Sequence, residues 1–198
     1  MFHTFLSSML LLTAIIQGGD KIQFSAGPHY SYYLLYQDDK EAQGEWGIGG
    51  EISITNVIPN IGLKLRGARL RYEDAENSYV YEYTPLSLCT SFNILPFLKV
   101  EWLRLSVETG FGFYLWQGLH DDEVIELPTG EKMEEKDIGF VGGLTIQLRP
   151  IKLIVLEYST RYNYIASADI YKYGFTDKDE KIWENGFGLK VIIPLVRR

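Results

Sequence analysis

From Lys21 to the last residues, apolar and polar residues alternate with a period of two. This is the period of a β-strand, whose successive side chains point to opposite faces of a sheet. No stretch shows the apolar spacing of a surface helix, and the 198 residues suit one domain. The sequence therefore predicts an all-β fold with strands over residues 21–35, 44–56, 61–73, 78–95, 98–115, 137–149, 152–165 and 182–195.

The connections between these strands alternate in length. Those after the second, fourth and sixth strands are short and contain proline, as turns favour: NVIPN at 56–60, LPF at 95–97 and RPI at 149–151. The other connections are longer and polar, and the longest covers residues 118–137, followed by residues 166–181. This alternation predicts an up-and-down antiparallel barrel with both chain ends on the side of the short turns.

The two faces of each predicted strand differ in composition. In the strand over 98–115, Arg104 and Glu108 share a face with Gly110 and Gly112, and the opposite face is a row of Leu, Val and Phe. Glycine weakens a strand on a solvated face, whereas the interior of an eight-stranded barrel is only just wide enough for side chains. We therefore predict that the polar face lines the lumen and that the apolar face points outward to lipid.

Charges on the predicted lumen face come together when neighbouring strands fold at their turns. The register pairs Glu51 with Arg66, Arg161 with Glu184, and Glu157 with Lys190. A buried charge is tolerated when it is paired and hydrogen-bonded. We predict a plugged lumen with a charge network of Glu51, Arg66, Arg104, Glu108, Glu157, Arg161, Glu184 and Lys190. The alternative is a set of exposed cross-strand pairs on a soluble sheet.

Aromatic residues gather near the long-loop ends of the predicted strands. Amphipathic rings at one end of a barrel are typical of the membrane–water interface, whereas a soluble core would spread them along the strands. The predicted girdle consists of Tyr32, Trp46, Tyr72, Tyr81, Tyr114, Trp116, Tyr162, Tyr164 and Trp183.

Two strands change their apolar phase partway along. In residues 61–73 the apolar positions shift from Leu63 and Leu65 to Ala68 and Leu70, and residues 78–95 show a similar shift near Pro85. An extra residue in a strand reverses the faces beyond it, and proline cannot donate to the hydrogen-bond ladder. These shifts predict a bulge at Gly67 and a bulge or kink near Pro85.

The first residues, MFHTFLSSMLLLTAIIQGGD, have the pattern of a secretory signal. An apolar core over 5–16 is followed by Gly18 and Gly19 before the charged Asp20. We predict a signal peptide over 1–19 and a barrel domain over 20–198. An uncleaved anchor is the alternative, although the core is short for a membrane-spanning helix of about 20 residues.

Charge and cysteine content exclude several functions. The net charge of −7 and the isoelectric point near 5.0 argue against nucleic-acid binding, which needs a basic face. Cys89 is the one cysteine, so the sequence supplies neither a disulfide framework nor a cysteine-based zinc site. The acidic segments HDDEVIE (120–126) and EKMEEKD (131–137) contain ligands for Ca²⁺ or Mg²⁺, but their spacing matches no EF-hand and favours solvated loops.

In these features the chain resembles the small eight-stranded outer-membrane β-barrel family of OmpA/OmpX type, over about residues 20–198. The resemblance implies a monomeric transmembrane barrel in a bacterial outer membrane, exported by its signal peptide and in contact with membrane lipid and lipopolysaccharide. It also implies insertion by the outer-membrane insertion machinery, no cofactor, and a role in membrane integrity, adhesion or surface contact without catalysis. The chain departs from the family at its end, VIIPLVRR, which lacks the terminal aromatic residue of these barrels.

Two alternative functions remain open in the sequence. A soluble secreted barrel of lipocalin type would bind an apolar ligand in its interior. An outer-membrane enzyme acting on lipid A would use His29 and Ser31, which share one strand face in the segment PHYS. The phase of that strand places this face in the lumen, and no carboxylate is evident in the sequence to orient His29, which favours an interior hydrogen-bonding role.

Overall fold

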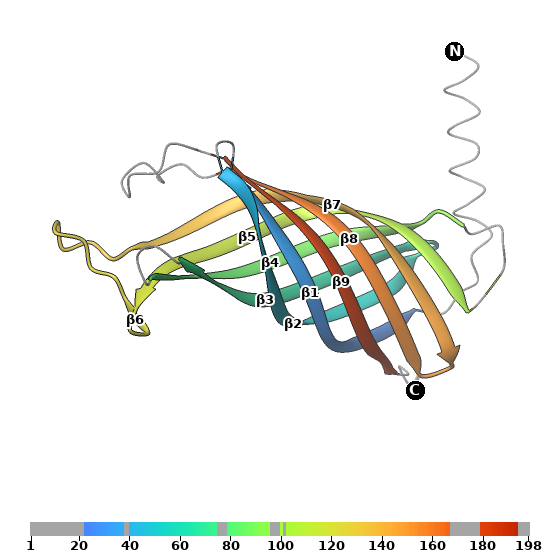
Figure 1. Ribbon diagram of the computed structural model, residues 1–198. Coiled ribbons are helices and arrows are strands. Elements are labelled where there is room, and N and C mark those ends of the chain that lie inside the picture. The colour runs from blue at the N-terminus through green and yellow to red at the C-terminus, as the bar shows by residue number, and fades with distance from the viewer. Residues whose placement is uncertain are drawn as a thin grey trace, which may run out of the picture.

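The computed structural model describes residues 22–37, 40–74, 79–95, 100, 102–166 and 179–193. Eight strands of this part of the chain form a barrel (Figure 1): β1 (Gln23–Gln37), β2 (Lys40–Ile58), β3 (Ile61–Asp74), β4 (Tyr79–Asn93), β5 (Leu103–His120), β7 (Glu134–Ile151), β8 (Ile154–Ala166) and β9 (Asp179–Ile193). A two-residue strand, β6 (Glu123–Val124), pairs with the end of β5. In the described ranges, no helix has the length and apolar character needed to cross a membrane.

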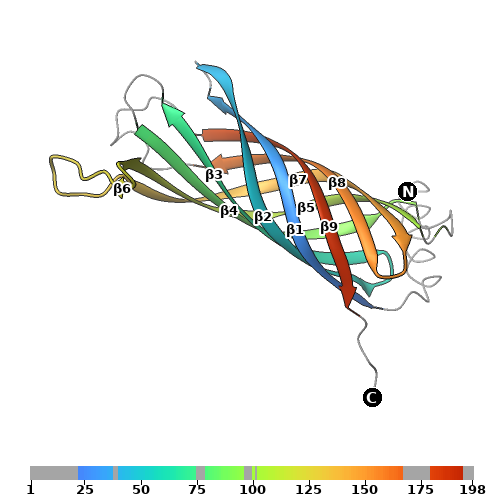
Figure 2. The same ribbon diagram turned by 60° about the horizontal axis from the view of Figure 1, so that its bottom comes forward.

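Every barrel strand pairs antiparallel with its neighbour in sequence, and the first strand pairs with the last. The pairing of β1 with β9 runs from Phe24 opposite Ile193 to Tyr36 opposite Lys181 and closes the sheet (Figure 2). The prediction of an all-β, closed, eight-stranded antiparallel barrel is confirmed. The predicted signal peptide over 1–19 and the C-terminal residues 194–198 lie outside the described residues.

The longest connection is itself a β-hairpin. Strand β5 continues to His120 and β7 begins at Glu134, so both extend beyond the bounds that the sequence predicts. Asp121 and Asp122 make the turn between β5 and β6 with φ angles of 52° and 62°, as a type I′ hairpin turn requires. Figure 1 shows this segment, in yellow, projecting beyond the barrel at the end opposite the β7–β8 turn.

Interior glycines let the strands curl tightly. A Cβ atom at Gly49 would overlap the carbonyl oxygen of Gly67, and one at Gly110 would overlap the carbonyl oxygen of Leu88. A side chain at either position would therefore force neighbouring strands apart. This close approach explains why glycine recurs on the interior face of a barrel this narrow.

The predicted bulge at Gly67 is wrong, and strand β4 has no bulge at Pro85 either. The β2–β3 register is continuous through Gly67, which lies opposite Gly50, and the β4–β5 register is continuous through Pro85, which lies opposite Tyr114. The register shifts that the described strands do show lie near strand ends. The apolar phase changes in sequence because the interior of the barrel becomes apolar toward the long loops, while the alternation of the backbone is unbroken.

Candidate functional site

The interior of the barrel contains two layers of side chains. The middle holds charged groups, called here the charge cluster: Lys64, Arg66, Arg161, Lys190, Glu51, Glu108, Glu157 and Glu184. All eight side chains are buried, and the four positive charges equal the four negative ones. The layer toward the long loops is a group of aromatic and aliphatic side chains, called here the apolar cluster.

Arg66 bridges three glutamates of the charge cluster. Its guanidinium lies 2.6 Å from Glu51, 2.9 Å from Glu157 and 2.7 Å from Glu184, and it also donates to the Ser159 hydroxyl at 3.0 Å. These partners lie on β2, β8 and β9, so one side chain of β3 joins both sides of the bore. The planar guanidinium has five donors in a fixed geometry, which suits such a site better than the ammonium of lysine.

The other three cations complete the network. Lys64 lies 2.9 Å from Glu157 and also contacts Glu108. Lys190 lies 2.5 Å from Glu157 and also contacts Glu51. Arg161 donates to Glu108 at 2.6 Å. A buried ion pair repays the loss of hydration only when its geometry is good and its remaining atoms are hydrogen-bonded. The dense bonding of this cluster meets that condition for most of its atoms.

The structure brings seven of the eight predicted lumen charges together and separates one. The predicted pairs Glu51–Arg66 and Glu157–Lys190 are in contact. Arg161 lies opposite Glu184 in register, as expected, but its guanidinium bonds Glu108 on β5 instead.

Arg104 lies nearer the short turns and donates to the Asn56 side chain at 2.6 Å. Lys64 belongs to the charge cluster and was not among the predicted lumen charges, although its position between the outward Leu63 and Leu65 marks it as an interior residue.

His29 and Ser31 lie inside the barrel, as the strand phase predicts. The Ser31 hydroxyl lies 2.5 Å from His29 Nε2 and donates to Glu184 at 3.1 Å, and Glu184 also lies 3.0 Å from His29 Nε2. The expectation that no carboxylate orients His29 is wrong, because β9 places Glu184 beside it across the closed seam of the barrel. Gly186 leaves the room for this group, since a Cβ there would overlap the Ser31 hydroxyl.

This group does not have the geometry of a catalytic triad. In a triad one ring nitrogen of histidine contacts the nucleophile and the other contacts the acid. Here both contacts fall on Nε2 of His29, and Nδ1 is buried without a hydrogen-bond partner. Ser31 is fully buried, so no substrate reaches its hydroxyl in this structure. His29, Ser31 and Glu184 therefore form hydrogen bonds with one another inside the barrel.

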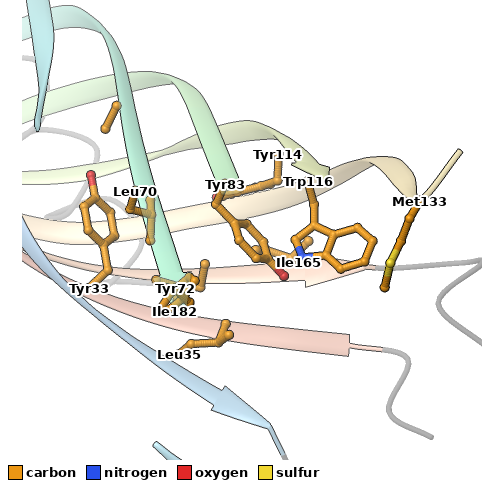
Figure 3. Close-up of a cluster of buried hydrophobic side chains, with 11 residues drawn as sticks. Tyr33, Leu35, Leu70, Tyr72, Tyr83, Tyr114, Trp116, Met133, Ile165 and Ile182 are labelled. Atoms are coloured by element: carbon orange, nitrogen blue, oxygen red, sulfur yellow. The ribbon is translucent and has the colours of Figure 1, made fainter. Parts of the chain in front are cut away.

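The apolar cluster fills the barrel interior toward the long loops. Figure 3 shows ten of its members converging in the interior: Tyr33, Leu35, Leu70, Tyr72, Tyr83, Tyr114, Trp116, Met133, Ile165 and Ile182. Ala68 also belongs to it. Met133 comes from the long hairpin and packs over Gly118, so the hairpin contributes to the filling. Tyr114 donates to Asn163 at 2.8 Å and Tyr83 donates to Glu180 at 2.6 Å.

Four residues of the predicted aromatic girdle belong to this interior layer. Tyr72, Tyr114 and Trp116 are buried members of the apolar cluster, and Tyr81 packs against it and stacks on Trp116 with ring centroids 5.7 Å apart. Their prediction as lipid-facing residues is wrong. Tyr114 and Trp116 continue the interior series Arg104, Ser106, Glu108, Gly110 and Gly112, so strict alternation along the strand is the signal that identifies them.

The other five girdle residues lie on the outer face. Trp46 is 51% exposed and stacks on Tyr30 at 4.7 Å. Tyr162 lies 6.0 Å from Trp183 between ring centroids. Tyr32 lies beside Trp46 at 5.0 Å, and Tyr164 is exposed on β8.

The rest of the outer face is also apolar. Each barrel strand exposes large apolar side chains, for example Tyr30, Ile48, Leu65, Leu88, Phe111, Phe140, Leu156 and Phe187. Ile48 is 68% exposed and Phe140 is 62% exposed, while the eight side chains of the charge cluster are buried. A soluble protein buries its apolar side chains and solvates its charges. This barrel has the opposite distribution.

The acidic segments of the long hairpin do not assemble a metal site. Within the described residues, which include both segments, no three His, Cys, Asp or Glu side chains are grouped as metal ligands.

Comparison with known proteins relates the chain to others through its fold. No family of known proteins matches the sequence, and no curated protein matches it either. Neisserial surface protein A is 12% identical, with a TM-score of 0.61 over 85% of this chain and 96% of that chain. A major outer membrane protein from Thermus thermophilus is 12% identical, with a TM-score of 0.62 over 88% of this chain and 100% of that chain.

Ail, the attachment invasion locus protein of Yersinia pestis, is 14% identical, with a TM-score of 0.56 over 88% of this chain and 100% of that chain. In each comparison nearly all of the solved structure is covered, so the likeness extends over the whole barrel. The chain has the fold of the small eight-stranded outer-membrane β-barrels.

Proposed function

We propose that the protein is an integral β-barrel of a bacterial outer membrane with a non-enzymatic role, structural or adhesive, at the cell surface. The observation that carries this proposal is the inverted distribution of side chains, with apolar groups outside and paired charges inside. In lipid, every backbone polar group needs an internal partner, and a closed barrel supplies one without leaving a free edge. An outward apolar band on a polar interior is the pattern of outer-membrane barrels.

A soluble barrel that binds an apolar ligand needs a different interior. Such a barrel has room inside for the ligand and turns its apolar face inward. Here charged side chains fill the middle of the bore, and tightly packed aromatic side chains fill the layer toward the long loops. The exposed apolar face is also too extensive for a soluble monomer, whose largest apolar patches reach about 300–600 Å².

The filled bore also argues for a surface role over a transport or catalytic one. The charged layer joins opposite walls through Arg66 and Lys64, so side chains cross the path that a solute would take. The Ser31–His29 group is enclosed in the same layer. The features that remain available to partners are the outer face and the loops.

The long hairpin is the best candidate for contact with other molecules. It projects beyond the barrel on the side opposite the short turns (Figure 1), and its residues His120, Asp121, Asp122 and Glu123 are exposed. Ail, which shares the fold, is named for attachment and invasion. By analogy of fold, we extend an adhesive role to this hairpin as part of the proposal.

Detergent partitioning and gel mobility test the membrane assignment. The protein is expressed in a bacterium with an outer membrane, and we expect it in the outer-membrane fraction, extracted by detergent and not by salt. The folded barrel should migrate differently from the boiled protein on an electrophoretic gel. Recovery of a folded protein in the aqueous fraction without detergent would contradict the proposal.

Replacement of the hairpin tip separates the structural role from the adhesive one. Residues 120–131 are replaced by a two-residue Asn-Gly turn, which keeps Gln117 opposite Glu134 and suits a type I′ hairpin. If the protein is adhesive, cells with this variant should bind less well to host-cell surfaces than cells with the natural chain. Unchanged binding with a normally inserted barrel would leave the structural role as the one supported.

A further inference from the structure

The apolar outer face contains a groove with a volume of about 1040 Å³. Its floor is formed by Ala26 on β1, Gly50 on β2 and Gly67 on β3, and Leu86, Phe111 and Phe113 rise beside it. Gly50 and Gly67 lie directly opposite each other in the β2–β3 ladder. The two glycines leave a gap where neighbouring positions carry large side chains, and this gap makes the surface concave.

The groove floor is open and not closed by packing. A Cβ atom added at Gly50 would meet only the carbonyl oxygen of Gly27, at 3.8 Å. Gly67 is partly covered, since a Cβ there would lie 2.8 Å from the Leu86 side chain. The volume matches that of small-molecule sites, which range over about 300–1,000 Å³. The lining is apolar, so the groove suits a hydrocarbon chain.

Two arginines follow the groove directly on the same outward face. Along β3 toward the long loops, the outward positions after Gly67 are Arg69 and Arg71, each about 7 Å further on. Their side chains are 56% and 44% exposed. Both bond Glu82, at 2.5 and 2.8 Å, so one carboxylate holds the two guanidinium groups side by side. Arg71 also bonds the exposed Asp122 at 3.2 Å, and an exposed pair of this kind contributes little.

The change from apolar to polar surface at Arg69 extends along the neighbouring strands. A second, smaller hollow of about 240 Å³ lies on the outer face of β4, β5 and β7 and is lined by Thr84, Gln117 and Lys136 among others. On β7, Lys136 is the next outward position after Ile138, which lines the apolar groove. The groove therefore ends at a polar boundary on several strands.

From this geometry we infer that the groove binds a phosphate-bearing membrane lipid, with an acyl chain along Gly50 and Gly67 and the phosphate on Arg69 and Arg71. The inference rests on the proposed membrane location. Guanidinium groups bind phosphate through paired charge-assisted hydrogen bonds. The acyl chain and the phosphate of one lipid are adjacent, as the groove and the arginine pair are.

A second copy of the chain fits this surface less well. A two-fold contact places the same patch of both subunits against itself. Here that would set one concave groove against another and bring the arginine pairs of both copies together. A lipid supplies a convex chain for the groove and a phosphate that accepts hydrogen bonds from the two guanidinium groups.

Native mass spectrometry of the purified, delipidated barrel in detergent tests the inference. Phosphatidic acid and a diacylglycerol with the same acyl chains are the two probes, because they differ only in the phosphate. We expect phosphatidic acid to bind about tenfold more tightly, the effect of one charge-assisted hydrogen-bond pair. Equal binding of the two lipids would overturn the inference.

Matched variants locate the site. Gly50→Leu should fill the groove and reduce phosphatidic-acid binding at least tenfold. Gly142→Leu is its control, because Gly142 also faces outward, lies outside the groove and has nothing within 4 Å of an added Cβ. The double variant Arg69→Gln, Arg71→Gln should remove the preference for phosphate, and Lys152→Gln at the β7–β8 turn is its control.

Wild-type lipid binding by Gly50→Leu would contradict the inference, and so would a change from dimer to monomer in that variant. Insertion of each variant is measured separately by gel mobility. Failure of the natural chain to insert counts against the proposed function. Normal insertion without a lipid preference counts against the groove alone.

Discussion

The charge cluster and the apolar cluster occupy the same interior face of the same strands and differ in how they are held together. In the charge cluster, each long side chain bonds partners on several strands, as Arg66 does with Glu51, Glu157 and Glu184. In the apolar cluster, side chains such as Leu70 and Ile182 fill space by packing against their neighbours. The stability of the charge cluster should thus depend on every charged group being present, whereas the stability of the apolar cluster should depend on the volume of its side chains.

Arg66→Met should have the largest effect, because it leaves three buried glutamates with fewer partners. Removing one partner of a buried ion pair costs about 3–5 kcal/mol. The free energy of unfolding, measured by urea titration in lipid vesicles, should fall by this amount. Lys152→Met, at an exposed position in the β7–β8 turn, is the control. Exposed ion pairs contribute less than about 1 kcal/mol. A loss of that size for Arg66→Met would show that water reaches the charge cluster and screens its ion pairs.

Leu156→Arg tests the division between the inner and outer faces. Leu156 is exposed on β8 next to the buried Glu157, so the alternation puts it in contact with lipid. An arginine on the lipid face at mid-barrel should cost about 2–4 kcal/mol in a bilayer. The same unfolding titration measures the loss. Stability equal to that of the natural chain would show that this face is solvated.

Leu70→Ala and Leu65→Ala compare the two sides of one strand. Leu70 lies in the apolar cluster, and Leu65 is exposed on the outer face of β3. Both variants lose the same apolar atoms, but only the interior one leaves a cavity, because lipid fills the space outside. Leu70→Ala should therefore be the more destabilising by about 1–3 kcal/mol. Equal losses would indicate that the interior layer collapses around the missing side chain.

Tyr72→Phe should have the smallest effect and the opposite sign. The Tyr72 hydroxyl is buried without a hydrogen-bond partner, and an unsatisfied buried polar group costs about 1–3 kcal/mol. Its removal should leave stability unchanged or raise it by about 1 kcal/mol. Tyr114→Phe is the contrast, since its hydroxyl donates to Asn163 at 2.8 Å, and it should be destabilising. A clear loss for Tyr72→Phe would point to a bound water at that hydroxyl.

Much of the fold follows from the alternation alone. The strands, the closed antiparallel barrel and the inward direction of Glu51, Glu108 and Glu157 could all be predicted, because side-chain direction in a strand depends only on position. The contact of Glu51 with Arg66 could be predicted because a short turn fixes the register of adjacent strands. The strict alternation of side-chain direction along a strand also identifies Lys64, Tyr114 and Trp116 as interior residues.

Contacts between strands that are distant in sequence could not be predicted. Arg161 lies opposite Glu184 in the ladder but bonds Glu108 from another wall, and His29 meets Glu184 only because β1 closes on β9. These choices depend on the width of the bore and on the reach of each side chain across it, which no local pattern contains. The phase changes near Gly67 and Pro85 were wrongly predicted as bulges, because a bulge and a change from a charged to an apolar interior give the same pattern in sequence.

The strands, the two faces and the order of the turns follow from the sequence alone, because they depend on a period of two and on neighbouring residues. The closed barrel sets which aromatic residues fill the bore, which glutamate each cation bonds, and where the outer face is concave. These features arise when a closed barrel brings distant strands to within the length of a side chain.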